Sequence, residues 1–331
     1  MSDVTPIRWG IIGTGGIATA FATDLALMPD ASLVAVGSRS QGTADDFGER
    51  FDVPHRHATY AGLVNDADVD AVYVSTPHPG HHDAALSAIN AGKAVLVEKP
   101  FTMTASEASS LIDAARSQGV FLMEAMWARW LPHMVRVREL LASRALGDVR
   151  VVIADHNQWF ARDPAFRLFD PALGGGALLD LGIYPVSFAS MVFSAPTRVT
   201  AVSDRAFTGV DATTSVILQY EDGAHSVLTT SLEVAGPNRA VIVGTEARIE
   251  IDSVFYAPTT FTLIGRDGMV QERFDQPQAE GRGMQHEAAE VMRCIRAGKL
   301  ESDVLPLRET LAIMETLDEI RRQIGLVYPG E

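Results

Sequence analysis

Short apolar runs alternate with stretches of mixed polarity through the first 128 residues. The runs 7–12, 33–37, 71–75, 94–97 and 120–123 have the length and composition of strands. The intervening stretches 18–28, 44–51, 80–91 and 105–118 predict helices. Short, fully apolar strands separated by helices indicate a parallel sheet that is covered on both faces. The pattern therefore predicts an α/β fold that starts with a doubly wound, Rossmann-type domain over residues 1–128.

The pattern changes after residue 148. Strand-like runs follow at 149–154, 198–204, 213–220, 224–232, 239–243, 248–252 and 260–264, and helices are predicted at 284–297 and 306–324. Short turns such as Asp222-Gly223 and Asp267-Gly268 are good hairpin signals. We predict a second, α+β domain over 129–331 with an open-faced, mostly antiparallel sheet, whose last helix packs back on the first domain. A free sheet face also predicts a homodimer formed through it.

Composition and charge narrow the classes of function. The chain of 331 residues is long enough for two domains, each with its own core. Its formal charge of −15 argues against nucleic acid or an anionic membrane as a partner, since both need a basic surface. The single cysteine, Cys294, excludes an intrachain disulfide, and no leader or run of membrane-spanning length is evident. We expect a soluble, cytoplasmic protein.

A glycine-rich loop follows the first apolar run. It consists of Gly13, Thr14, Gly15, Gly16 and Ile17, and the first predicted helix begins just after it. The first glycine allows a tight turn, and the second lets the backbone approach a phosphate group. The amide groups at the start of the helix favour a bound anion. The loop therefore predicts a site for the pyrophosphate of a dinucleotide.

The end of the second predicted strand indicates which dinucleotide is bound. An NAD site usually has an acidic residue about 20 residues past the glycines, but this chain has Ser38, Arg39 and Ser40 there. A guanidinium and two hydroxyls suit a 2′-phosphate. We predict NADP as the cofactor, with NAD as the weaker alternative. The competing interpretation of Arg39 is a solvated loop arginine.

Two further segments carry candidate chemistry. Lys99, in Glu98-Lys99-Pro100, follows a buried strand, at the place where ligands of doubly wound sheets bind. We expect Lys99 to transfer protons there. We also expect a cis peptide bond before Pro100, which would direct Lys99 into the cleft. Asp180 and Tyr184 follow the glycines 174–176 and share a face if this stretch is helical, although Pro185 makes the helix imperfect. Tyrosine can donate a proton to a carbonyl oxygen, and aspartate can accept a bond from a substrate hydroxyl. The alternatives are a solvated lysine, a capping aspartate and a core tyrosine.

These segments together resemble the Gfo/Idh/MocA oxidoreductases. The glycine loop, Ser75-Thr76-Pro77, Glu98-Lys99-Pro100 and residues 174–184 occur in that family's order, and residues 124–132 are most similar to its dihydrodiol and NADP-dependent xylose dehydrogenase branch. Trp130 departs from the phenylalanine expected there. The resemblance implies a Rossmann domain with an open-faced sheet domain, NAD(P)-linked chemistry on a carbinol, and catalytic roles for Lys99, Asp180 and Tyr184.

The remaining site residues follow from position. For the cofactor we expect contacts from Ser75, Thr76, Pro77, His78, His81, Glu98, Pro100, Trp127 and Arg129, and for the substrate from Trp127, Trp159, Phe160 and Arg162. We predict no metal, because neither the histidines at 78, 81 and 82 nor residues 286–290 match a metal-site spacing. The predicted function is an NADP-dependent oxidoreductase acting on a small sugar or vicinal diol. The alternatives are a non-catalytic nucleotide sensor of the same fold and an enzyme that never releases its NADP.

Overall fold

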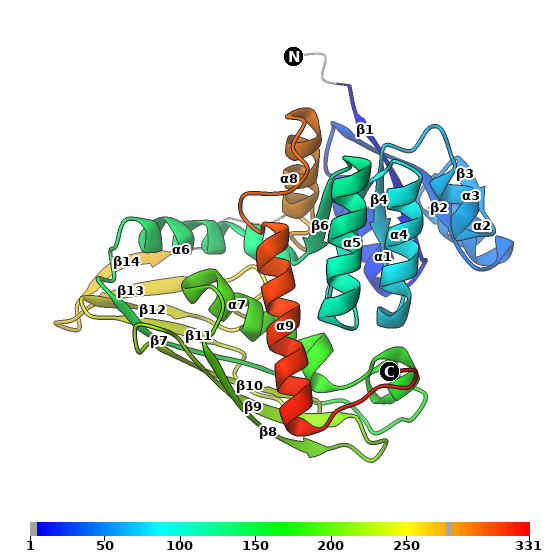
Figure 1. Ribbon diagram of the computed structural model, residues 1–331. Helices are drawn as coiled ribbons and strands as arrows, with labels where there is room; N and C mark the ends of the chain where they lie inside the picture. The colour runs from blue at the N-terminus through cyan, green and yellow to red at the C-terminus, as the bar shows by residue number, and fades with distance from the viewer. Residues whose placement is uncertain (1–4, 276–279) are drawn as a thin grey trace. The chain divides into compact units, whose positions relative to one another are not determined.

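The chain forms two compact units in the computed structural model, which describes residues 5–275 and 280–331 (Figure 1). Within these ranges, the first unit consists of residues 5–127 and 280–310, and the second of residues 128–275 and 311–331. The chain leaves the first unit after residue 127, one residue before the predicted boundary. Both units are therefore built from two separate stretches of sequence.

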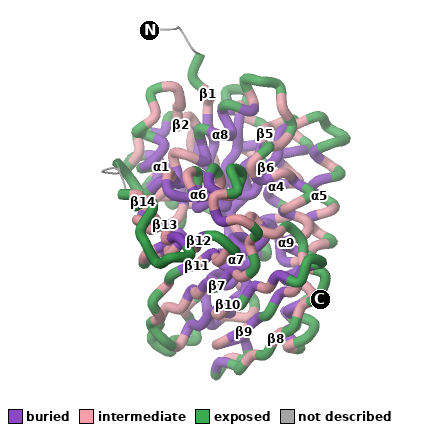
Figure 2. Tube along the Cα trace, turned by 90° about the vertical axis from the view of Figure 1, so that its left-hand side faces the viewer, coloured by how far each residue is buried: buried purple, intermediate pink, exposed green. Residues whose placement is uncertain are grey.

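The first unit has a six-stranded parallel sheet, which confirms the predicted doubly wound class. Its strands lie in the order β3-β2-β1-β4-β5-β6 and every neighbouring pair is parallel. The strands are β1 (Ile7–Ile12), β2 (Ala31–Gly37), β3 (His55–His57), β4 (Ala71–Val74), β5 (Ala94–Glu98) and β6 (Leu122–Ala125). The helices that follow them are α1 (Gly16–Leu25), α2 (Gln41–Arg50), α3 (Tyr60–Val64), α4 (His81–Asn90) and α5 (Ala105–Gln118). The strands β1, β5 and β6 run through a largely buried part of the trace (Figure 2).

A segment distant in sequence completes this unit. Helix α8 (Gln285–Arg296) and its flanking residues belong to the first unit, whereas we predicted everything from 129 onward to belong to the second. The Asp24 carboxylate accepts the backbone N–H groups of Arg282, Gly283 and Met284 at 2.8–3.0 Å. The Leu122 amide donates to the Leu300 carbonyl at 3.0 Å. Such long-range capping leaves no mark in the local hydrophobic pattern.

The second unit has an eight-stranded sheet in the order β14-β13-β12-β11-β7-β10-β9-β8. All neighbouring pairs are antiparallel except β7 and β10, which confirms a mostly antiparallel sheet. The strands are β7 (Val149–Asn157), β8 (Arg198–Arg205), β9 (Asp211–Gln219), β10 (His225–Ser231), β11 (Ala240–Gly244), β12 (Ala247–Ile251), β13 (Phe261–Gly265) and β14 (Val270–Phe274). Its helices are α6 (Pro132–Ala142), α7 (Ile183–Phe193) and α9 (Leu307–Ile324), the last of which begins in the first unit.

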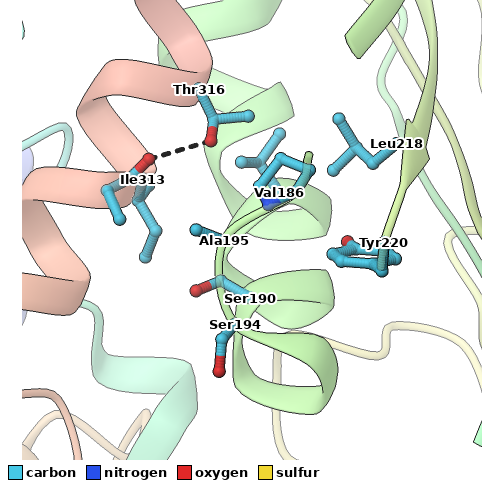
Figure 3. Close-up of a pocket in the computed structure, with 10 residues that line it drawn as sticks. Val186, Ser190, Ser194, Ala195, Leu218, Tyr220, Ile313 and Thr316 are labelled. Atoms are coloured by element: carbon cyan, nitrogen blue, oxygen red, sulfur yellow. Dashed lines mark hydrogen bonds between the residues drawn. The ribbon is translucent and has the colours of Figure 1, made fainter. Parts of the chain in front are cut away.

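One face of this sheet is packed against helices. Val186 of α7, Leu218 of β9 and Ile313 of α9 surround a small cavity of about 10 Å³, and Tyr220 closes its side (Figure 3). The opposite face carries an apolar row across four strands, because Val241, Ile153, Val227 and Ile217 are register partners in turn. Ile153, Val227 and Ile217 remain 41–48% exposed. The sheet is thus open-faced, as predicted.

Helical turns run from Pro171 to Phe193 in the centre of this unit. By length and composition the run could cross a membrane, with a mean hydropathy of 1.5, contrary to our expectation that no run approaches that length. However, 78% of its apolar window is buried inside the protein. It is therefore a core helix by its packing, and it includes Asp180 and Tyr184.

Candidate active site

The glycine loop has the geometry that a pyrophosphate requires. Gly13 has φ +99°, and a Cβ there would lie 2.8 Å from the Ser75 carbonyl oxygen, so only glycine fits. A Cβ at Gly15 or Gly16 would meet nothing within 4 Å, because these exposed residues border open space at the start of α1. Thr14 and Ile17, on either side, are half-buried. The bare backbone and the free amide groups of a helix N-terminus fit an anionic phosphate.

The three residues after β2 divide their roles. The Ser38 hydroxyl lies 2.6 Å from the Thr43 hydroxyl, and the Ser40 hydroxyl caps α2 by accepting the Thr43 amide at 3.3 Å. Arg39 is exposed and has no ion-pair partner among residues 5–275 and 280–331. The predicted phosphate contact therefore depends mainly on Arg39, whereas the two serines also shape the turn that presents it.

Lys99 follows the last residue of β5 and is half-buried. The peptide bond between Lys99 and Pro100 is cis, as predicted. Behind it, the buried Glu98 carboxylate accepts the Tyr73 hydroxyl and, at 3.1 Å, the Lys99 amide. Glu98 thus bonds to β4 and to its own strand end, and its predicted contact with the cofactor stays a prediction.

Buried acids surround this strand end. Glu98, Glu124 and Glu287 are at most 4% exposed, and neither carboxyl oxygen of Glu287 has a hydrogen-bond partner within the described ranges. Burial raises the pKa of Glu98, and the Lys99 charge and the Tyr73 hydrogen bond oppose this shift. Burial raises the pKa of Glu287 well above its ordinary value, and the charges of Glu98, Asp24 and Glu124 raise it further. Glu287 consequently favours the neutral, protonated form.

The loop after β4 is held from inside. The Ser75 hydroxyl donates to the Ile12 carbonyl at 2.8 Å, and the side chains of Thr76 and His78 are buried. The ring nitrogens of His81 lie 2.8 Å and 2.9 Å from the carbonyl oxygens of Pro100 and Thr76. Burial and the nearby His78 lower the pKa of His81 to about 3, against the hydrogen bonds to the two carbonyls. A neutral ring has one N–H and donates to one of these oxygens at a time. His81 lies between the Thr76 and Pro100 carbonyls, and its contact with the cofactor stays a prediction.

Asp180 and Tyr184 lie where a π-helical turn, Leu178–Gly182, leads into α7. The prediction of an imperfect helix at this point is correct. The Asp180 carboxylate is 7% exposed and is held by the Arg167 guanidinium at 3.1–3.2 Å. The pair gives Asp180 a fixed direction, which a group that orients a substrate hydroxyl needs.

The Tyr184 ring belongs to an aromatic cluster that the sequence did not reveal. His156 and Tyr256 stack with ring centroids 3.9 Å apart, and Tyr184 lies 5.2 Å and 4.8 Å from them. The period-two alternation along 149–157, which places residues 152, 154 and 156 inward, was the available signal for His156. Tyr256 lies in no helix or strand, so no pattern marked it.

Several predicted ligand contacts have other roles. The Arg129 guanidinium is buried and donates to the Ser187 carbonyl at 2.7 Å, so it anchors α7, and its predicted contact with the cofactor stays a prediction. Trp127 is 2% exposed, with the Arg282 guanidinium 5.3 Å from its ring centre. Phe160 packs on Phe166, and Arg162 forms a surface pair with Glu233 at 3.0 Å. Trp159 is 64% exposed and remains available for a ligand.

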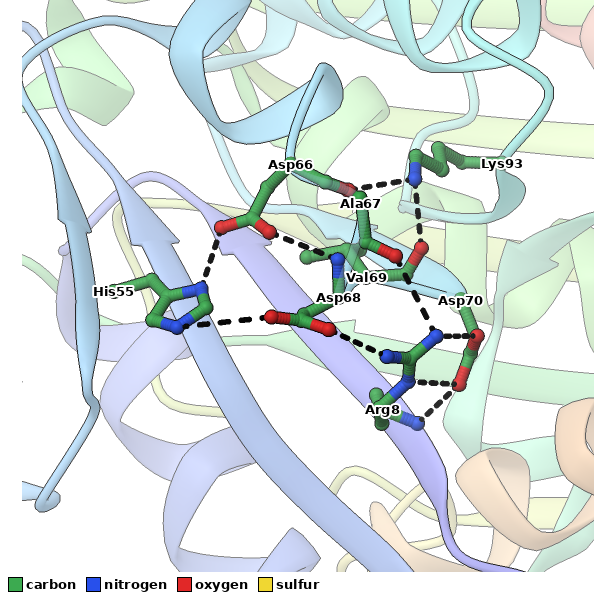
Figure 4. Close-up of polar contacts among 8 residues, drawn as sticks. All are labelled: Arg8, His55, Asp66, Ala67, Asp68, Val69, Asp70 and Lys93. Atoms are coloured by element: carbon green, nitrogen blue, oxygen red, sulfur yellow. Dashed lines mark hydrogen bonds and ion pairs between the residues drawn. The ribbon is translucent and has the colours of Figure 1, made fainter.

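A polar cluster at the other end of the parallel strands bears on the metal prediction (Figure 4). His55, Asp66 and Asp68 place donor atoms within 4.8 Å of one another. However, Asp66 already accepts from His55 and His57 at 2.7 Å and 2.9 Å, and Asp68 pairs with Arg8 at 2.8 Å. Burial alone would raise the pKa of Asp66. Hydrogen bonds from the Asp68 amide and from both histidines outweigh this effect and lower the pKa to about 2. The cluster joins strand ends on the edge opposite Lys99.

Comparison with known proteins places the chain in a family. Residues 7–126 match the model for the oxidoreductase family with NAD-binding Rossmann fold, and residues 134–250 match the GFO/IDH/MocA C-terminal domain. The mouse trans-1,2-dihydrobenzene-1,2-diol dehydrogenase is 40% identical over 98% of this chain and 99% of its own, and the human enzyme is 37% identical over the same shares.

Solved structures agree with this match. An aldose-aldose oxidoreductase from Caulobacter crescentus, complexed with glycerol, has 27% identity and a TM-score of 0.87. A 3-ketoreductase from Actinomadura kijaniata, in complex with NADP and TDP-benzene, has 27% identity and a TM-score of 0.84. Each comparison covers 97% of this chain and 98% of the other. The chain therefore belongs to the Gfo/Idh/MocA family of oxidoreductases.

Proposed function

We propose that the protein is an NADP-dependent oxidoreductase that transfers a hydride between the nicotinamide and a carbinol of a sugar or vicinal diol. The observation that carries the proposal is the retention of Lys99 at the end of β5 together with the fixed Asp180 and Tyr184, in a chain 40% identical to a dihydrodiol dehydrogenase. A non-catalytic nucleotide sensor has no need for proton-transfer groups, so the alternative is less well supported.

The side chains divide the proton chemistry among them. NADP, when bound, accepts the hydride that leaves the carbinol carbon. In the reductive direction, the Tyr184 phenol donates its proton to the carbonyl oxygen while the carbon receives the hydride. In the oxidative direction, the Tyr184 phenolate takes that proton back from the hydroxyl as the carbonyl forms. The Lys99 ammonium bonds the same hydroxyl and stabilises the negative charge that develops on oxygen. Asp180, held by Arg167, accepts a hydrogen bond from the neighbouring hydroxyl and so orients the substrate.

NADP is favoured over NAD by the exposed Arg39 at the end of β2, where an acidic residue would bind an unphosphorylated ribose. The NADP complex of the 27% identical ketoreductase supports the same choice. Replacing Arg39 by alanine should weaken NADP about 10- to 100-fold and leave NAD nearly unchanged, because the loss removes a charge-assisted bond to phosphate only. Fluorescence titration with each reduced cofactor measures both constants. Equal weakening of both would contradict the assignment.

Flat aromatic faces suggest the substrate class. The exposed Trp159 ring offers a surface that suits a sugar ring or an aromatic diol, whereas Tyr184, His156 and Tyr256 are buried against one another. The direct test is to screen pentoses, hexoses and trans-dihydrodiols, each with NADP and then NAD, by the absorbance of the reduced nicotinamide. We expect NADP-linked turnover of at least one of these groups. NADP binding without turnover of any of them would favour the sensor.

The open face of the second sheet supports a homodimer in our proposal. Exposed Ile153, Val227 and Ile217 form a continuous apolar row that a second copy of the chain can cover. Ile217→Lys should shift the protein from dimer to monomer in sedimentation. Met269→Lys, at an even more exposed position in the β13–β14 turn, is the control and should leave the dimer intact. A monomeric parent protein would overturn this part of the proposal. We also propose a cytoplasmic location, because a chain with one cysteine has no intrachain disulfide and suits a reducing compartment.

A further inference from the structure

The turn that precedes the Asp180 and Tyr184 helix is built from closely approaching backbone. Gly174 and Gly176 have φ +67° and +114°, and the Gly176 amide donates to the Leu168 carbonyl at 2.8 Å. A Cβ at Gly175 would lie 2.7 Å from that carbonyl oxygen, and a Cβ at Gly176 would lie 2.1 Å from an Asp211 carboxyl oxygen. The backbone therefore has room for glycine alone, and its course is determined by what it packs against.

Asp211 holds one end of this turn. It is fully buried at the start of β9, and its Oδ2 accepts the Leu178 amide at 2.7 Å and the Thr214 hydroxyl at 3.1 Å. Leu178 opens the π-helical turn, so the carboxylate binds one of the amide groups that a helix start leaves without an internal partner. Burial raises the pKa of Asp211 to about 6 against these two hydrogen bonds and the Arg205 charge. A buried acid kept at such a place points to a specific role.

Tyr328 holds the other end from the C-terminal tail. Its buried phenol donates to the Gly175 carbonyl at 2.6 Å. The Arg321 guanidinium lies 4.8 Å from the centre of the Tyr328 ring and pairs with Glu331, whose carboxylate accepts the Tyr328 amide at 3.0 Å. Chain ends usually fray unless they are tied down. Here three interactions fold residues 325–331 back onto α9 and direct one hydroxyl at the turn.

We propose that Asp211 and Tyr328 are positioning residues for the reaction, acting on Asp180 and Tyr184 through the backbone of residues 175–178. This inference rests on the proposed function of Asp180 and Tyr184. Each residue binds a single main-chain group of the turn: Tyr328 binds the Gly175 carbonyl, and Asp211 binds the Leu178 amide. Two fixed points on either side of Gly176 set the direction in which the π-helical turn starts. Misplacement of a catalytic group by about 1 Å can cost on the order of 100-fold in rate.

The test compares two tyrosines that each lose one buried hydroxyl. Tyr328→Phe removes the bond to the Gly175 carbonyl and keeps the ring. Tyr220→Phe is the control, because Tyr220 is also buried and its hydroxyl lies 3.1 Å from Ser226, at the cavity beside the far end of α7 (Figure 3). We expect kcat to fall about ten-fold in Tyr328→Phe and less than two-fold in Tyr220→Phe, with similar losses of Tm. The NADP dissociation constant should not change in either variant.

A second pair of variants tests Asp211 by conservative rescue. Asp211→Asn keeps an oxygen for the Leu178 amide and should retain kcat within about three-fold, whereas Asp211→Ala should lose at least ten-fold. Normal kcat in both Tyr328→Phe and Asp211→Ala would overturn the inference. Tyr184→Phe separates this failure from failure of the proposed function. If Tyr184→Phe is inactive while Tyr328→Phe and Asp211→Ala are normal, only the positioning role is refuted. If Tyr184→Phe has normal activity, the proposed function fails, and the inference falls with it.

Discussion

The candidate catalytic residues of the two units are held in place in different ways. Lys99 stands one residue past a strand whose register with β4 and β6 fixes its position, and the group bonded next to it, Glu98, is its neighbour in sequence. Tyr184 depends on side chains far along the chain, since His156 and Tyr256 contact its ring while Asp211 and Tyr328 hold the preceding turn. The placement of a catalytic group by a local motif can be predicted from the sequence. Placement by residues far along the chain becomes known only from the structure.

The largest effect should come from the locally placed group. Lys99→Ala removes the ammonium that stabilises charge on the substrate oxygen, and we expect kcat to fall by about 10²–10⁴-fold. The NADP dissociation constant should remain nearly the same, because the glycine loop and Arg39 are untouched. Steady-state rates of nicotinamide reduction, with fluorescence titration of NADPH, measure both quantities. Near-normal turnover would remove Lys99 from the mechanism.

A smaller effect tests the remotely supported residues. Arg167→Met removes the ion pair that Arg167 forms with the buried Asp180 carboxylate, and we expect KM for the substrate to rise about ten-fold because this pair helps to direct the carboxylate. Arg248→Met is the matched control, since Arg248 pairs with Glu250 at the surface, where such pairs contribute little. Equal KM values for the two variants would show that Asp180 does not depend on Arg167.

The smallest effect concerns stability on the Lys99 side. Consider a carboxyl whose pKa is higher in the folded than in the unfolded state. Its contribution to stability is complete below the unfolded-state pKa and is lost as the pH rises through the folded-state pKa. Glu287 is such a group, so the protein should lose stability above about pH 4.5 as the folded state resists giving up that proton. Glu287→Gln copies the neutral form and should be more stable than the parent at pH 9, by about 1–3 kcal/mol, with little difference at pH 5.

Urea unfolding at the two pH values measures this difference. Asp303→Asn is a suitable control for a general charge effect, because Asp303 is an exposed acid in the same unit, near the end of α8. If Glu287→Gln were less stable than the parent at both pH values, the carboxylate would have to be ionised and paired, and the comparison between the two units would need revision.

Much of the fold follows from local pattern. The apolar runs and hairpin turns correctly predict both sheet types, and the cis Pro100 bond was also expected. The short strand β3 and the polar edge strand β14 were missed because their sequences carry little apolar content. Helix α6 was also missed, although Met134, Val137 and Leu140 have helical spacing and are buried. The assignment of residues 280–310 to the first unit was missed because Asp24 holds this segment through hydrogen bonds from its backbone amides, which leave no pattern in the sequence.

The site was predicted less evenly. Gly13, Lys99, Asp180 and Tyr184 all lie in short motifs that the sequence shows. The family resemblance implied the catalytic roles of the last three. The environment of these residues was not accessible, since a hydrogen bond between Tyr328 and Gly175 joins positions that no local pattern relates. The bonds of His81 and Arg129 were not predicted for the same reason. Each side chain bonds to carbonyl oxygens of its own unit, and no local pattern indicates those partners.

The capping of α8 by Asp24 has a consequence for synthesis. Because the first unit requires residues 280–310 and the second requires residues 311–331, neither is complete when its first stretch emerges from the ribosome. At roughly 5–20 residues per second, residue 127 precedes residue 310 by about 10–40 seconds, during which Asp24 has no amide groups to accept. The first unit can therefore complete its fold only after residue 310 has been synthesised. A fragment in which residues 280–310 directly follow residue 127 should bind the dinucleotide, whereas a fragment of residues 1–127 alone should not.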